Sequence, residues 1–75
     1  MDRLHPIKAY RDRHGITLAE MGALIGVGKA AIFKWEHGLR PPASRAIDIE
    51  QATNGELPRW ELRPDLWAPP QEVAE

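Results

Sequence analysis

The segment from Lys29 to His37 carries the side chains best suited to contact a partner. At helical spacing its Ile32 and Trp35 form one apolar stripe, which a small protein would bury. A solvated helix face is the alternative for its two lysines, and a core position is the alternative for its phenylalanine. The pattern favours a binding surface made by the side chains left on the opposite face. These are Lys29, Ala30, Phe33, Lys34 and His37.

The patterns that could indicate a metal site or a catalytic site are weaker. The spacings of His5, His14 and His37 match no zinc pattern, and no cysteine assists them. Glu20 and Ser44 have the ordinary roles of helix-capping residues, and there is no Ser/His/Asp set or glycine-rich phosphate loop. We therefore expect no enzymatic activity, no cofactor and no metal.

Length and composition narrow the class of protein. The chain has 75 residues, enough for one small domain but with little room for a catalytic cleft. It contains no cysteine, which excludes a disulfide scaffold and a thiolate metal site. There is no apolar run of membrane-spanning length and no signal peptide. We expect a cytoplasmic protein with no membrane partner.

Charge is unevenly distributed, although the net charge is only −1. Residues 1–45 hold eight basic and four acidic residues, whereas residues 46–75 hold two basic and seven acidic residues. The asymmetry favours a first half that faces a polyanion and a second half that faces something else.

Turn and capping residues predict the elements that position these side chains. Thr17 and Glu20 have the spacing of a capping box, and Gly15 suits the left-handed end of a helix. The chain is expected to be all-α, a compact four- to five-helix bundle over residues 1–68 with a frayed acidic tail at 69–75. The expected helices cover about 6–14, 18–25, 29–37 and 45–53, with a short helical turn at 59–62.

The turn Gly26-Val27-Gly28 joins the second and third expected helices. Three residues are too few for an ordinary antiparallel pair of helices, so the two must cross steeply, as in a helix-turn-helix. This motif would cover about residues 18–37. Gly22 stands where the third helix is expected to approach the second closely, which requires a small side chain.

Two stretches of the chain carry a more specific pattern. The first is GALIGVGKAAIFKWEHG at residues 22–38, and the second combines IEQATNG at 49–55 with LRPD at 62–65. In these stretches the chain resembles Cro-like and YdaS-type helix-turn-helix proteins, a family of phage repressors and antitoxins. The resemblance covers about residues 4–67 and implies a lambda-repressor-like DNA-binding domain. Gly28 departs from the usual serine, and Phe33 from a position that is usually small or polar.

The resemblance also implies roles for individual residues. The third helix would enter the major groove of double-stranded operator DNA. Lys29 and Lys34 would face guanine, and Ala30 and Phe33 would face thymine methyl groups. Phosphate contacts, which set the register on DNA, would come from the helix openings and the following loop. These contacts are assigned to Thr17, Leu18, Gly28, His37, Arg40 and Arg45.

The size of the expected site favours a homodimer. One helix reads too few base pairs to select a genomic site, and two-fold symmetry would double the reader. The acidic second half should point away from phosphates, and it carries more apolar area than a short tail needs. We expect the interface around residues 55–67. Its candidate residues are Leu57, Trp60, Leu62 and Trp67.

Three functions remain open. The first is a sequence-specific DNA-binding transcriptional regulator, expected to be a Cro-like repressor. The second is an antitoxin-like module whose main partner is a toxin protein, with DNA autoregulation secondary. The third is a purely structural helical module, which would leave the basic face of the third helix idle.

Overall fold

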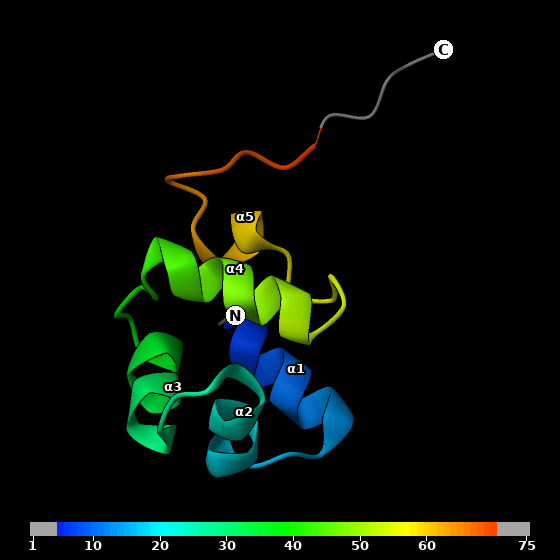
Figure 1. Ribbon diagram of the computed structural model, residues 1–75, viewed down its shortest axis with the longest axis vertical. Helices are drawn as coiled ribbons and strands as arrows, with labels where there is room; N and C mark the ends of the chain where they lie inside the picture. Colours follow the sequence, from blue (N-terminus) through cyan, green and yellow to red (C-terminus); the bar gives the residue numbers. More distant parts are fainter. Residues whose placement is uncertain (1–4, 71–75) are drawn as a thin grey trace, which may run out of the picture.

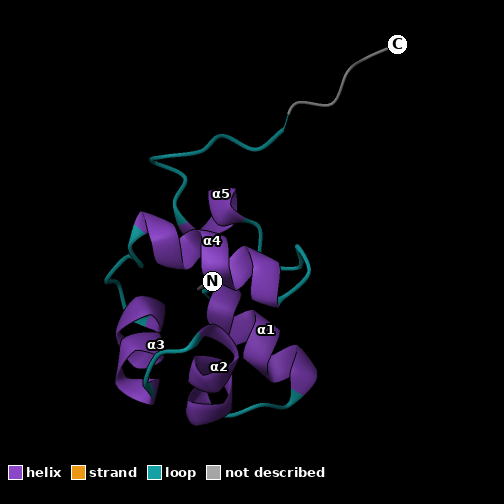
Figure 2. Ribbon diagram, viewed as in Figure 1, coloured by secondary structure: helices purple, strands orange, loops and turns teal. Residues whose placement is uncertain are grey.

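The computed structural model describes residues 5–70, and these residues form helices and loops with no strand (Figure 2). The helix predicted at each of the five places is present, which confirms the all-α bundle. The bounds are α1 Pro6–His14, α2 Leu18–Ile25, α3 Lys29–Glu36, α4 Ala43–Ala52 and α5 Arg59–Leu62.

The ends of α1 and α2 follow the predicted capping chemistry. Pro6 opens α1, and Gly15 closes it in the left-handed conformation with φ of 64°. At the start of α2, the Thr17 hydroxyl accepts a hydrogen bond from the Glu20 amide, and the Glu20 carboxylate accepts one from the Thr17 amide. Both halves of the capping box are therefore present.

Two boundaries differ from the sequence prediction. Helix α3 ends at Glu36, and His37 is its C-cap. Helix α4 begins two residues earlier than expected, because Pro42 adopts an extended ψ of 157° and becomes the N-cap. Ser44 consequently lies inside the first turn of α4 and makes no capping hydrogen bond, so its predicted role was wrong.

The helices are arranged around α4. In Figure 1, α2 and α3 lie below α4, α5 lies above it, and α1 runs beside them. Apolar side chains from every helix meet in one core, which is completed by Leu57 from the loop before α5. The buried set is Ile7, Tyr10, Met21, Ile25, Ile32, Trp35, Ala46, Ile49, Leu57 and Leu62.

The loop between α4 and α5 is fixed from inside the core. Thr53 is buried, and its hydroxyl donates to the Ile49 carbonyl at 2.8 Å while accepting from the Leu57 amide at 3.1 Å. One hydroxyl thus forms hydrogen bonds with a carbonyl at the end of α4 and with a backbone amide of the loop. This arrangement holds Leu57 in the core and sets where α5 begins.

Part of the predicted tail, residues 71–75, lies outside the described residues, as do residues 1–4 of the predicted domain. Residues 66–70 follow α5 without helical structure. Among the helices of residues 5–70, none combines the length and the apolar character needed to cross a membrane.

Candidate nucleic-acid interface

The turn between α2 and α3 depends on Gly22. A Cβ atom at this position would lie 2.5 Å from the Val27 carbonyl oxygen and 3.2 Å from the backbone of Gly28. The Gly22 carbonyl also accepts hydrogen bonds from the amides of Gly26 and Val27. The need for a small residue was predicted correctly, but the backbone that approaches Gly22 belongs to the turn and not to α3.

Helix α3 has the predicted division into a buried and an exposed face. Ile32 is fully buried and Trp35 is 6% exposed, so both pack into the core. Phe33 is 50% exposed, which excludes the alternative that it is a core residue. Lys29, Ala30 and Lys34 are also exposed. The four residues expected to contact bases therefore share solvent-accessible positions on one helix.

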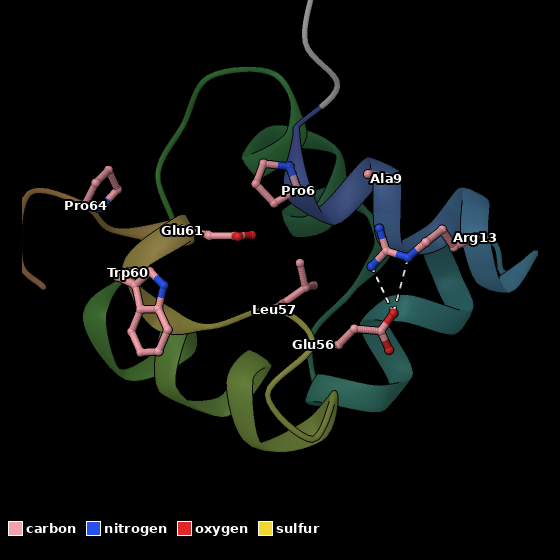
Figure 3. A pocket seen from close by; sticks show the side chains of 8 residues that line it. All are labelled: Pro6, Ala9, Arg13, Glu56, Leu57, Trp60, Glu61 and Pro64. Atoms are coloured by element: carbon pink, nitrogen blue, oxygen red, sulfur yellow. Dashed lines mark hydrogen bonds and ion pairs between the residues drawn. The ribbon is translucent and has the colours of Figure 1, made fainter. Parts of the chain in front are cut away.

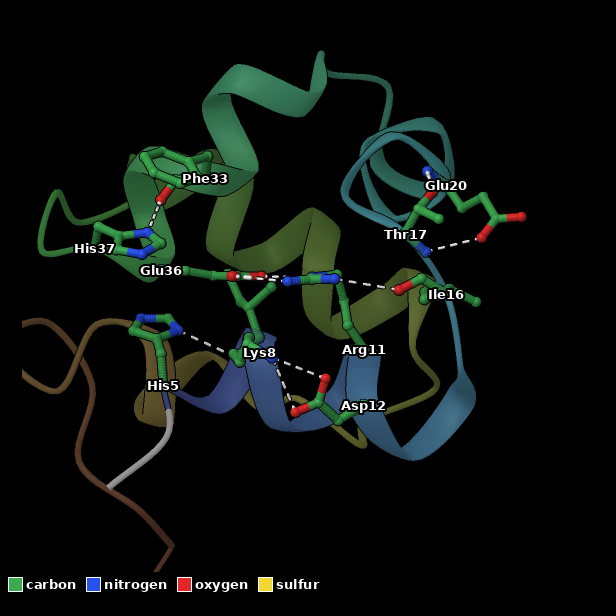
Figure 4. Close-up of polar contacts among 11 residues, drawn as sticks. His5, Lys8, Arg11, Asp12, Ile16, Thr17, Glu20, Phe33, Glu36 and His37 are labelled. Atoms are coloured by element: carbon green, nitrogen blue, oxygen red, sulfur yellow. Dashed lines mark hydrogen bonds and ion pairs between the residues drawn. The ribbon is translucent and has the colours of Figure 1, made fainter. Parts of the chain in front are cut away.

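His37 is fixed against this exposed face. Its ring stacks on Phe33, with ring centroids 4.0 Å apart, and its Nδ1 lies 2.8 Å from the Phe33 carbonyl oxygen (Figure 4). Because a carbonyl oxygen only accepts, Nδ1 must carry the proton. The neutral ring then presents an unprotonated Nε2, which cannot donate to a phosphate. His37 suits the predicted phosphate contact only in its charged form.

The opening of α2 keeps part of its predicted anion-binding capacity. The Thr17 amide already donates to the Glu20 carboxylate at 2.8 Å, whereas the Thr17 hydroxyl only accepts from the Glu20 amide and can still donate its own hydrogen. The amides of Leu18 and Ala19 have no acceptor within the helix, as helix geometry requires. A phosphate would therefore meet these two amides and the Thr17 hydroxyl, beside a carboxylate that repels it. At α3, Gly28 is the N-cap and supplies no side-chain hydrogen bond.

The two arginines expected to contact phosphates have partners within the chain. Arg40 forms an ion pair with Asp65 at 2.9 Å, and Arg45 forms one with Asp48 at 3.2 Å. Asp65 also accepts from Arg63, whose hydrogen bond is the main reason that the pKa of Asp65 falls to about 2. Sequence alone gave no sign of the pairing between Arg40 and Asp65, because the residues are far apart along the chain.

Two lysines differ from all other described basic residues because they form no ion pair within residues 5–70. The lysines and arginines of α1, α4, α5 and the loops each lie within ion-pair distance of a carboxylate. Lys29 and Lys34 are the exceptions within residues 5–70, and both lie on α3. The positive charge that the fold leaves uncompensated is therefore gathered on the helix predicted to contact DNA.

A nearly buried ion pair fixes the end of α3 to α1. The Arg11 guanidinium donates to both carboxylate oxygens of Glu36, at 2.7 and 3.0 Å, and to the Ile16 carbonyl at 3.2 Å (Figure 4). The side chains are only 13% and 3% exposed. Bidentate geometry gives such a pair directional control, so it orients α3 relative to α1 and the loop before α2. Sequence reasoning had not assigned these two residues a role.

His5 lies near the same ion pair and caps α1. Its Nδ1 accepts a hydrogen bond from the Ile7 amide at 3.1 Å. Burial lowers the pKa of His5, although the negative charge of Glu36 acts in the opposite direction. The ring therefore favours its neutral form, which keeps Nδ1 available as the acceptor.

The four residues expected to form a dimer interface do not share one surface. Leu57 and Leu62 are 1% and 3% exposed, so they belong to the core of a single chain and that assignment was wrong. A small bundle needs both to cover the side of α4 that faces α5. Trp67 packs against the core, with the Arg59 guanidinium 5.4 Å from its ring centroid. Trp60 is half-buried and keeps part of its surface open.

Comparison with known proteins shows which family the chain belongs to. Residues 17–70 match the family described as "Bacterial toxin YdaS", a match that includes α2 to α5 and more than half of the chain. The chain belongs to the YdaS family. This confirms the YdaS part of the resemblance seen in the sequence.

One curated YdaS relative also matches. It is a protein of Escherichia coli (strain K12) named "Putative transcriptional regulator YdaS", which is 45% identical over 47 residues. The match covers 61% of this chain and 48% of the relative, so the chain spans about half the length of the curated relative it matches. No solved structure matches the chain.

Proposed function

We propose that this YdaS-family chain is a transcriptional regulator that binds double-stranded DNA through α3. The proposal involves no catalytic step and no cofactor. The relative's printed name supports the regulatory role. The exposed face of α3, at the end of a short glycine turn from α2, has the form of a recognition helix that can enter a major groove.

The observation that carries this proposal is the pair of uncompensated lysines. Lys29 and Lys34 have no ion pair with the rest of residues 5–70, whereas the other described lysines and arginines do. An unpaired ammonium group keeps its full attraction for phosphates and for the O6 and N7 acceptors of guanine. Phe33 between them offers apolar area to thymine methyl groups.

The finer proposal is a Cro-like repressor that covers a promoter as a homodimer in the cytoplasm. Two recognition helices related by two-fold symmetry would contact half-sites about 34 Å apart, one turn of DNA. We assign no dimer interface, because Leu57 and Leu62 of the expected set are buried and Trp67 packs against the core of its own chain.

Selection of bound sequences from a random DNA pool tests the proposal. We expect enrichment of one motif with guanine among the enriched bases, arranged as an inverted repeat. The control is a chain carrying Lys29→Ala and Lys34→Ala, which should enrich no motif while remaining helical by circular dichroism. Recovery of the same motif by this control would contradict the role of α3.

A second candidate function is an antitoxin-like module whose main partner is a toxin protein. The printed description of the family, which names a toxin, favours a role connected with toxicity. The adjacent gene distinguishes the candidates, because a divergent repressor gene favours the Cro-like regulator and a toxin gene favours the antitoxin-like module. In the antitoxin-like module, DNA binding would serve to regulate the module's own gene.

A further inference from the structure

A groove lies between α1 and α5, and none of the four residues expected to contact bases lines it. Its main hollow has a volume of about 530 Å³. The lining residues are Pro6, Ala9, Arg13, Glu56, Leu57, Trp60, Glu61 and Pro64 (Figure 3). A second hollow of about 220 Å³ shares Pro6, Glu61 and Pro64 with the first and extends toward Trp35 and Leu39. The two hollows adjoin at Pro6, Glu61 and Pro64, and together they are called the groove.

Glu61 is the one carboxylate among residues 5–70 that has no ion pair or capping contact with the rest of these residues. Every other described aspartate and glutamate either forms an ion pair or, in the case of Glu20, accepts a hydrogen bond in the capping box. Glu61 does neither within residues 5–70, and it is exposed. Figure 3 shows its side chain pointing into the hollow between Pro6 and Leu57, with no dashed contact.

The basic residues at the two ends of the groove are already neutralised. Arg13 donates to Glu56 at 2.9 Å, and Arg40 lies 2.9 Å from Asp65. Within residues 5–70, the charge of the groove that has no ion pair is therefore the negative charge of Glu61. Around it the lining is mixed, because proline rings and the open side of Trp60 supply apolar area while Arg13 and Glu56 supply polar area.

We propose that this groove binds a segment of another protein that inserts an arginine side chain between apolar residues. A guanidinium can pair with the Glu61 carboxylate while its planar face lies against the Trp60 ring. The stem and the flanking apolar residues of the segment would fill the proline-lined walls on either side. Lys29 and Lys34 are not among its lining residues, and of the residues expected to contact phosphates only Arg40 lines the second hollow.

A second copy of the chain is the less suitable occupant. Within residues 5–70, the cations without an ion pair are Lys29 and Lys34, so among these residues only those of α3 could enter the groove of another copy without breaking an ion pair. Any other described basic residue would first have to break an ion pair. A separate protein that supplies its own arginine needs neither to insert α3 nor to break an ion pair of this chain.

Panning a library of random peptides against the full chain tests this proposal. The peptides recovered should share an arginine flanked by apolar residues, and they should be lost when the same library is panned against Glu61→Lys. The nearby variant Glu50→Lys, at the partner of Arg59 outside the groove, is the matched control and should retain them. Enrichment of peptides without a basic residue, or equal recovery on Glu61→Lys, would overturn the proposal.

Nuclear magnetic resonance then locates the contact with one recovered peptide and its citrulline analogue, which keeps the shape of arginine without the charge. The indole N–H signal of Trp60 should move, while that of Trp67 should stay. Glu61→Gln should weaken binding about five-fold, as expected for an ion pair that remains partly in water. Equal affinity of the arginine and citrulline peptides would overturn the proposal.

Two further measurements separate this proposal from its alternatives. Glu61→Gln should leave affinity for the selected DNA unchanged, so the groove and the DNA interface can fail independently. Sedimentation equilibrium of the free chain examines the second copy as occupant. A dimer that Glu61→Lys dissociates would overturn the assignment to another protein.

Discussion

At the scale of single residues, the two halves of the chain differ in which charges the fold neutralises. Lys29 and Lys34 on α3, and Glu61 on α5, have no ion pair with any residue in the described range 5–70. Arg40 and Arg45 were expected to act on phosphates in the same way as the lysines, but each is paired with a carboxylate. Binding of DNA by these arginines therefore has to compete with an ion pair.

Lys34→Ala and Arg40→Ala should consequently have different effects. Loss of a contact to a base edge should cost about 1–3 kcal/mol on the selected site and relax the preference there. Arg40→Ala should lower affinity by a smaller amount that is similar on selected and random DNA. Fluorescence anisotropy with both DNAs measures this, with Lys8→Ala, which removes a paired lysine of α1, as the control. Equal losses on both DNAs for Lys34→Ala would show that Lys34 contacts only phosphate.

Asp65 should make stability depend on pH in the acid range. Its pKa is lowered from 3.8 to about 2 by the hydrogen bond from Arg63, so the folded state favours the carboxylate. That stabilisation is complete above 3.8 and is lost as pH falls toward 2. The Tm difference between the natural chain and Asp65→Asn should be largest above this range and should vanish at its lower end. Thermal melts followed by circular dichroism measure this Tm difference, with Asp48→Asn as the control. A Tm difference that stays constant with pH would contradict the account.

At the scale of elements, sequence patterns predicted the ends of α1 and α2 correctly and the start of α4 incorrectly. Local signals such as Gly15 and the Thr17–Glu20 capping box act within one turn of chain, and these gave correct ends for α1 and α2. The start of α4 was missed because Pro42 itself adopts the N-cap conformation, leaving Ser44 inside the helix. The exposure of Phe33 could be predicted since Ile32 and Trp35 already supply the buried stripe.

Gly22 provides a test of the geometry between α2 and α3. Gly22→Ala would place a Cβ atom 2.5 Å from the Val27 carbonyl oxygen, and backbone atoms cannot move aside without opening the turn. The expected loss is about 1–3 kcal/mol in the free energy of unfolding, together with weaker DNA binding. Gly28→Ser is the matched control, because a Cβ atom there meets nothing within 4 Å. Urea denaturation followed by circular dichroism measures both, and equal stability of the two variants would contradict the close approach.

At the scale of the whole molecule, contacts between distant residues account for what the sequence did not reveal. Leu57 and Leu62 looked like surplus apolar area in an acidic tail, but α5 folds back over α4 and buries both. The same fold-back brings Asp65 to Arg40. Such contacts depend on how loops direct the chain, and no local pattern encodes them. The lysines of α3 could be assigned correctly to an exposed face because their environment is set by one helix.

The central claim is that this small acidic protein binds DNA through a local basic face. Its net charge of −1 does not prevent this, because the local field and not the total charge guides the encounter. The most direct test is the salt dependence of affinity for the selected DNA. If a dimer neutralises about six to eight phosphates, the logarithm of affinity should fall with the logarithm of salt concentration at a slope of about −5 to −7. A slope near zero, or no binding at low salt, would contradict the claim.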